Sequence, residues 1–536
     1  RRKRCDRPRV GTSCTFCIRR GLECIVEQQS ATAPAREDGY EPFVSTRGDG
    51  AAPISPAALM PDRQLCNELV DLYFRYIHVA FHNLFHRPSF EAGMLDGTIP
   101  KILVFGVFGL SARFSSHPYF ADIGPQERGR PYAKEAERLL DLHKGCLTTI
   151  QACVLLGAIQ VVEMDSATES IFYTIACRLA MILDLPNSPA KTRIEQEVNL
   201  RVWWSVVATD AWSSTALGLP RAIQPRYDID MPMDERMFLN LSPTEPPVYP
   251  HRGPDVPLSP ASDQSKSLIA QMIKLNGILY DINTFNAKAT AETLQEDRVR
   301  DAVGELSAAL EAWESELPAD MQYTANNLQY WADLGCGPSF VVLHINFNHA
   351  SQLLFYRFLH NSLKPDATHH PSSPVAIDDA TTQATTADYA TRCRSHAANL
   401  CEIIYASSCS PATEVLYPLA GHILVIASTV HLHTLLFGVD DAEIARARAR
   451  LEHNFQIITR LQRYWPSLQA SFSRLRAFHA ACMDVDKHEG TDVVFRLDRW
   501  MVRFLLDFAK PVDMAERYRE GGGDPASWLR LGDKVV

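Results

Sequence analysis

Four cysteines near the start of the chain carry the strongest chemical signal in this sequence. They are Cys5, Cys14, Cys17 and Cys24, separated by gaps of eight, two and six residues. Thiolates are the preferred ligands of structural zinc, and a Cys-x-x-Cys step brings two sulfurs to one metal ion. Because so short a segment has no core of its own, bound metal would supply its folding energy. We therefore predict that these four cysteines bind zinc.

The same segment is basic, whereas the rest of the chain is acidic. Residues 1–26 contain eight Lys and Arg against two acidic residues, a net charge of +6. The whole chain of 536 residues carries −10, so taking +6 from −10 leaves −16 for residues 27–536. A basic head on an acidic body fits a nucleic-acid contact that is confined to the head.

This head resembles the fungal binuclear zinc cluster transcription factors. Their module has six cysteines that hold two zinc ions, with a basic run before the third cysteine that usually ends in Cys-Asp. Cys5 to Cys24 match the third to sixth cysteines, and residues 1–4 match the basic run. Since the chain begins with Arg1 rather than Met, we expect a truncated fragment in which the first two cysteines, and so the complete cluster, are missing. A single zinc held by the remaining four cysteines is the less favoured alternative.

The resemblance also implies which residues contact DNA. In this family a short helix enters the major groove and reads a CGG-type triplet. Arg2 corresponds by position to the base-reading residue and Arg1 lies beside it; arginine contacts to guanine are common in such sites. Arg4, Arg19 and Arg20 are expected to contact phosphates, which adds affinity without sequence information.

The body is predicted to be all-α. From residue 62 onward, apolar residues recur mostly at three- and four-residue steps, and alternating strand patterns are nearly absent. Asp62 is placed to cap a first helix whose apolar steps continue to Leu84. Further helices are predicted around residues 100–114, 131–143, 147–163, 168–184, 194–217, 264–290, 297–317 and 384–510. Residues 297–317 have coiled-coil spacing over fewer than three heptads, so a packed bundle helix is favoured.

The longest apolar runs are predicted to be buried helices rather than membrane spans. Residues 150–162 are too few to cross a bilayer, and residues 419–437 contain His422, His431 and His433. No membrane association is expected.

Parts of the body resemble the fungal-specific regulatory domain that follows such zinc clusters. Residues 69–74 and 85–90 look like its opening helix and the turn after it. More specific is the Arg-Val-Trp-Trp run at 201–204, followed by Asp210 and by Gly-Leu-Pro at 218–220. The family usually has Arg where the second residue of that last element is Leu. Its first Arg usually stands one residue farther from the tryptophan pair.

Physical chemistry favours structural roles for these body residues. Trp203 and Trp204 on one helix are predicted to be core residues. Arg201 and Asp210 are predicted to form a buried or half-buried polar network.

Three histidines raise a second metal hypothesis. His78, His82 and His86 step by four, so one helical face could present them together. No carboxylate lies at the usual spacing, and Pro88 would end the helix, so ordinary packing and surface histidines are favoured.

The predicted domain boundaries follow from these features. They are 1–26 for the partial zinc cluster module, 27–61 for a flexible linker, 62–240 for the regulatory domain core, 241–262 for a Pro-rich loop, 263–510 for further helices with a polar linker at 363–383, and 511–536 for a tail.

Together these features predict a zinc-dependent, sequence-specific DNA-binding transcription factor that regulates RNA polymerase II transcription in the nucleus and is not an enzyme. The expected partners are promoter DNA, the transcription machinery and, since family members often dimerise, a second copy of the chain. The resemblance implies that the body regulates activity in response to a metabolite or signal. Two alternatives remain open. One is a helical regulatory or scaffold protein that no longer binds DNA, and the other is an α-helical enzyme with a site in the body.

Overall fold

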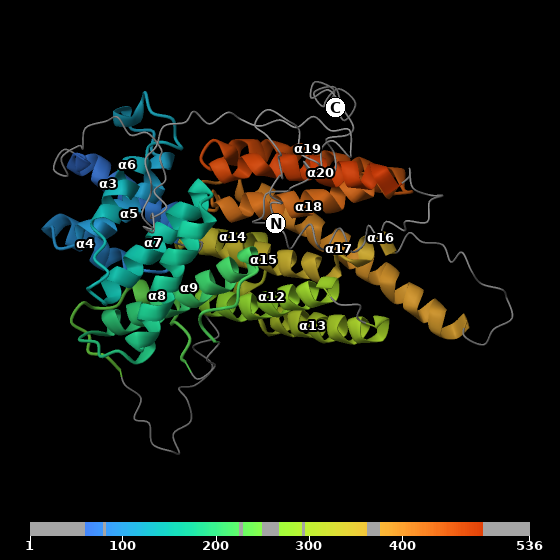
Figure 1. Cartoon of the computed structure of the whole chain (residues 1–536), viewed down its shortest axis with the longest axis horizontal. Coiled ribbons are helices and arrows are strands. Elements are labelled where there is room, and N and C mark those ends of the chain that lie inside the picture. The colour runs from blue at the N-terminus through green and yellow to red at the C-terminus, as the bar shows by residue number, and fades with distance from the viewer. Residues whose placement is uncertain are drawn as a thin grey trace, which may run out of the picture. The chain divides into compact units, whose positions relative to one another are not determined.

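The computed structural model describes residues 59–78, 82–224, 229–248, 267–291, 295–361 and 376–485. The chain separates into two compact units, residues 1–54 and 55–536, and every described residue belongs to the second. Within the described ranges all regular elements are helices and no strand occurs (Figure 1). The prediction of an all-α body is confirmed.

The first half of the body contains short helices together with three longer ones. They are α3 (Arg63–Tyr73), the π-helix η1 (Phe74–His78), α4 (Arg87–Asp96), α5 (Lys101–Ser111), α6 (Arg130–Arg138), α7 (Leu147–Glu163), α8 (Ser166–Ile182), α9 (Arg193–Leu217) and α10 (Glu235–Leu239), with 3₁₀ turns η2 (Ala112–Phe114), η3 (Pro118–Phe120) and η4 (Leu185–Asn187). The three longer helices are α7, α8 and α9.

The second half consists of longer helices. They are α12 (Leu268–Ala291), α13 (Glu296–Glu316), α14 (Ala325–Asp333), α15 (Gly337–Phe355), α16 (Phe358–Asn361), α17 (Ala376–Ser407), α18 (Pro418–Phe437), α19 (Asp441–Gln462) and α20 (Gln469–Val485), with 3₁₀ turns η5 (Ala319–Met321) and η6 (Pro466–Leu468). The helix α17 begins inside the segment predicted as a polar linker.

Local sequence signals explain where several helices begin and end. The Asp62 carboxylate accepts a hydrogen bond from the Leu65 amide at 2.9 Å, which caps α3 as predicted. Thr192 caps α9 in the same way through the Glu195 amide, at 3.2 Å. At its other end α9 stops at Gly218, whose φ of 65° is the left-handed conformation that glycine adopts at little cost.

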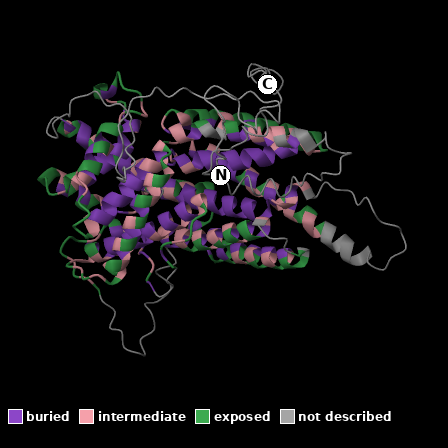
Figure 2. Cartoon of the chain, in the orientation of Figure 1, coloured by how far each residue is buried: buried purple, intermediate pink, exposed green. Residues whose placement is uncertain are grey.

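The core of the second half lies around α15, which is buried along its whole length because α12, α13, α14, α17 and α18 all pack against it. Apolar residues such as Phe340, Leu343 and Leu354 share this burial with polar ones such as His344, Asn348 and Gln352, several of which bond to neighbouring backbone or side chains. The helix α18 is long and apolar enough to span a membrane, yet most of it is buried among α17, α19 and α20 (Figure 2). This confirms the prediction of a buried helix for residues 419–437.

On α13, Val303 and Leu310 are buried toward α12 and α15, which confirms the prediction of a packed bundle helix for residues 297–317.

A buried arginine links the two halves. The Arg113 side chain is 2% exposed and donates to the carbonyls of Leu110 at 3.0 Å and Tyr464 at 3.1 Å. Its guanidinium lies 4.4 Å from the ring centre of Trp465. Burial lowers the pKa of Arg113 to about 10, so the group still carries its charge near pH 7 and holds η2 against the segment after α19.

Candidate functional site

The residues predicted to bind zinc and DNA lie outside the described residues. They are Cys5, Cys14, Cys17, Cys24, Arg1, Arg2, Arg4, Arg19 and Arg20. Among the residues that are described, no group of three or more His, Cys, Asp and Glu side chains could hold a metal ion.

The three histidines at four-residue steps do not share a helical face. The sequence predicted one helix from Asp62 to Leu84. The structure has α3 followed by η1, and η1 ends at His78. Residues 82–86 are not helical. All three histidines are buried, which confirms the expectation of ordinary packing and places none of them on the surface. The His78 Nε2 accepts a hydrogen bond from the Phe85 amide at 3.2 Å. Burial lowers the pKa of His78 to about 3 and that of His82 to about 4, which favours neutral packing residues.

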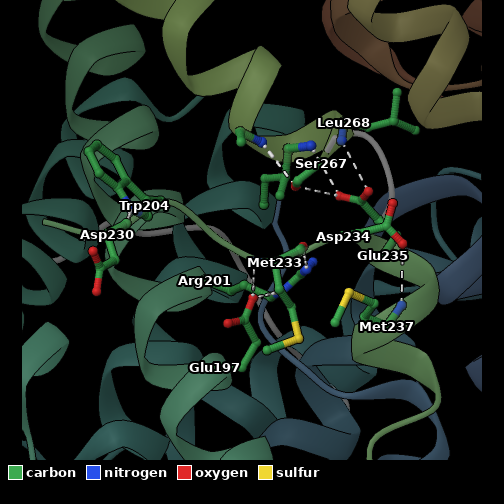
Figure 3. Close-up of polar contacts among 12 residues, drawn as sticks. Glu197, Arg201, Trp204, Asp230, Met233, Asp234, Glu235, Met237, Ser267 and Leu268 are labelled. Atoms are coloured by element: carbon green, nitrogen blue, oxygen red, sulfur yellow. Dashed lines mark hydrogen bonds and ion pairs between the residues drawn. The ribbon is translucent and has the colours of Figure 1, made fainter. Parts of the chain in front are cut away.

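The helix α9 carries a buried ion pair that fastens a distant segment. Arg201 Nε donates to Glu197 Oε1 at 2.8 Å, one helical turn away, and the two side chains are 2% and 4% exposed. The same Glu197 oxygen accepts from the Met233 amide at 2.9 Å, and the Arg201 guanidinium donates to the Met233 carbonyl at 2.6 Å. Both backbone groups of Met233 are thus paired with side chains of α9 (Figure 3). The Arg201 guanidinium also lies 4.1 Å from the ring centre of Phe238 on α10.

Burial and pairing oppose each other at Glu197. Loss of hydration raises the pKa of its carboxyl, while Arg201 and the Met233 amide act in the other direction. Removing these donors would leave a buried negative charge without a partner, which would strongly destabilise the folded protein.

Asp210 forms a second, separate network at the end of α9. Its carboxylate accepts from the backbone amides of Ala222 at 2.9 Å and Ile223 at 3.0 Å, and Arg221 Nε lies 3.4 Å away. These bonds close the turn that follows Gly218. Asp210 is buried, as predicted, but it does not join Arg201, so the expectation of one shared network is wrong. Nine helical residues at about 100° each place the two side chains on opposite faces of α9.

The tryptophan pair is part of the core, as predicted, with Trp203 2% and Trp204 8% exposed. The Trp204 indole also donates its N–H to the carbonyl of Asp230 at 3.0 Å (Figure 3). It therefore holds the segment before α10 in addition to packing.

Two acidic residues at the start of α10 complete the site. The Asp234 carboxylate caps α10 itself through the amides of Arg236 at 3.0 Å and Met237 at 3.3 Å. The Glu235 carboxylate turns to α12 and accepts from the amides of Leu268 at 3.0 Å and Ile269 at 3.1 Å, so it caps a helix that begins 33 residues later (Figure 3). Residues 230–235 are consequently bonded to α9 on one side and to α12 on the other.

This arrangement positions helices and presents no combination of side chains suited to a covalent step. Arg201, Trp204 and Asp210 stand out in the sequence, whereas Glu235 does not. An Asp-Glu-Arg run is a signal for a helix start, yet nothing in that run shows that Glu235 caps a different helix. The network borders a cavity between α9, α12 and α15, which Trp204, Glu235 and Leu268 help to line.

Comparison with known proteins places this site within a matched region. Residues 70–315 match the family model described as the fungal specific transcription factor domain. Over 330 residues the chain is 24% identical to an uncharacterized transcriptional regulatory protein of Schizosaccharomyces pombe, covering 56% of this chain and 33% of that protein. Over 491 residues it is 23% identical to the Zn(2)-C6 fungal-type transcription factor FTF1c of Fusarium oxysporum f. sp. lycopersici, covering 87% of this chain and 50% of that protein.

The chain thus spans between a third and a half of the length of these two relatives. The matched domain and the relatives support a role in transcription regulation, and they indicate a regulator rather than an enzyme.

Proposed function

We propose that this chain is part of a zinc-dependent, sequence-specific transcription factor whose head binds promoter DNA and whose helical body regulates that activity. One observation carries the proposal: a basic segment with four closely spaced cysteines precedes a body that matches the fungal specific transcription factor domain over residues 70–315. The name of the Fusarium relative, a Zn(2)-C6 factor, agrees with it.

In this proposal Cys5, Cys14, Cys17 and Cys24 ligate zinc. Four thiolates are the donor set that structural zinc prefers, and the intact cluster holds two zinc ions between six cysteines. The metal folds the head and takes no part in chemistry.

The basic residues then contact DNA in two ways. Arg2, with Arg1 beside it, reads guanines of a CGG-type triplet, and Arg4, Arg19 and Arg20 contact phosphates. A protein with this role acts in the nucleus on RNA polymerase II transcription, together with the transcription machinery and, as a dimer, a second copy of itself.

In this proposal the body acts as one folded helical unit. The ion pair on α9 and the caps at Asp234 and Glu235 tie α9, α10 and α12 together, so a change at one helix would reach the other two.

A second candidate is a helical regulatory or scaffold protein that does not bind DNA. The described body would serve that role without the head, because buried bonds tie its helices α9, α10 and α12 into one unit.

The test is DNA binding by the full chain extended at its N-terminus with the sequence encoded upstream. We expect zinc-dependent binding to duplexes with CGG triplets, lost on chelation and weakened steeply by salt. Changing Arg2 to Ala should weaken binding roughly ten- to hundredfold at CGG sites and relax their preference. The change Arg36→Ala, outside the head, is the control and should leave binding unchanged. A zinc-loaded, folded head that binds no such duplex would favour the second candidate.

A further inference from the structure

A cavity of about 70 Å³ lies where α9, α12 and α15 meet, beside the polar network. It is lined by Trp204 and Trp212 of α9, Met272 and Asn276 of α12, and Ser339 and Asn346 of α15, among others. A cavity needs about 10–15 Å³ of such volume to hold one water molecule, which is one non-hydrogen atom. The cavity therefore admits a ligand of roughly five or six non-hydrogen atoms.

Two asparagine oxygens on this cavity have no hydrogen-bond donor among the described residues. Asn346 is 3% exposed, and its Nδ2 approaches the Met272 sulfur at 3.1 Å while its Oδ1 is buried without a partner. The Oδ1 of Asn276 is likewise buried without a partner. More than nine in ten buried polar groups in proteins are paired. Two unpaired acceptors on one cavity therefore point to an occupant that donates hydrogen bonds.

The charge and ring chemistry of the lining narrow the class of occupant. Of the described residues that line the cavity none is Lys or Arg, whereas Glu235 contributes a carboxylate. Trp204 and Trp212 contribute indole rings, whose faces attract cations. An ammonium group supplies three donors and no acceptor, which complements two amide oxygens, a carboxylate and aromatic faces.

We propose that this cavity binds a small organic ammonium compound. Its ammonium group donates to Asn276 Oδ1 and Asn346 Oδ1 beside the indole rings of Trp204 and Trp212, and its apolar part of four or so carbons packs against apolar lining residues such as Leu268 and Ile273. Such a ligand contacts the same Glu235 that caps α12 and the same Trp204 that holds Asp230. Its binding therefore stabilises the junction of α9, α10 and α12 and gives the body a small-molecule input, whether or not the head binds DNA.

Three probes with the same four-carbon chain test the class directly on the full chain. They are n-butylammonium, 1-butanol and butyrate, compared at equal concentration and ionic strength by saturation-transfer NMR and by the shift in thermal unfolding temperature. We expect n-butylammonium to bind most tightly, 1-butanol weakly and butyrate least, because butyrate offers only acceptors. Equal behaviour of the three probes, or binding by none of them, would overturn the proposal and leave the cavity to water.

Variants then locate the binding. N276L and N346L keep the approximate shape of the side chain and remove the acceptor, so each should weaken n-butylammonium binding roughly tenfold or more. N286L is the matched control, because Asn286 is a buried asparagine of α12 that bonds Leu353 and does not line the cavity. It should leave the affinity unchanged. Retained affinity in folded N346L and N276L, checked by circular dichroism, contradicts the assignment. Loss of DNA binding by the head would not affect this result.

Discussion

Replacing Arg201 by Met should destabilise the body strongly, because it leaves the Glu197 carboxylate buried without its cation. That carboxylate is 4% exposed and, among the described residues, would retain the Met233 amide as its donor. Removing one partner of a buried ion pair costs about 3–5 kcal/mol. For a body of roughly 400 residues, in which unfolding entropy amounts to about 0.8 kcal/mol per degree, this lowers the Tm by about 4–6 °C.

A second substitution shows whether the unpaired charge is the cause. In the double variant E197Q/R201M the amide oxygen can still accept from the Met233 amide, but no buried charge remains. We therefore expect the double variant to be more stable than R201M, with a coupling free energy of about 1–3 kcal/mol.

The assay is thermal unfolding at pH 7, followed by circular dichroism, for the wild type, both single variants and the double variant. R392M is the matched control: Arg392 pairs with Glu311 at 2.7 Å and lies 4.4 Å from the ring centre of Phe355, but Glu311 is 60% exposed. Its loss should cost about 1 kcal/mol or less. A loss of stability in R201M no greater than in R392M, or an E197Q/R201M variant less stable than R201M, would show that the buried charge is not the cause.

Two further predictions concern acid and packing. Burial lowers the pKa of His349 and of His431 to about 3, against about 6.5 in the unfolded chain. Stability is therefore complete above pH 6.5 and falls as the pH drops toward 3, by about 2 kcal/mol for each of the two by pH 5; equal Tm values at pH 7 and pH 5 would contradict this. A Cβ at Gly157 would lie 2.3 Å from a ring carbon of Tyr173, so G157A should cost about 1–3 kcal/mol. The exposed helical Gly277 has nothing within 4 Å of an added Cβ, so the control G277A should instead raise stability by about 0.5–1 kcal/mol. A G157A variant as stable as the wild type would show that the Tyr173 ring moves aside without cost.

The helices themselves were largely determined by local sequence. The predicted range 147–163 coincides with α7, and the predictions at 194–217 and 297–317 differ by one residue from α9 and α13. The all-α fold class follows for the same reason. Apolar periodicity and end caps such as Asp62 act within one or two turns, so the residues that decide a helix are neighbours in the sequence.

The buried helices α7 and α18 were also predictable, since their long apolar runs must be covered. The central helix α15 received no predicted range, because polar residues from His344 to Gln352 interrupt its apolar pattern. The cysteines and arginines of the head, from Arg1 to Cys24, remain predictions, because they lie outside the described residues.

Only the tertiary structure decided which polar groups meet. Glu235 caps α12 across 33 residues, Asp210 pairs with Arg221 rather than Arg201, and Asn276 and Asn346 come together on one cavity from different helices. The sequence contains each of these side chains but no signal for its partner. A hydrogen bond requires donor and acceptor within about 3 Å, and for groups on separate helices that distance is set by how the helices pack.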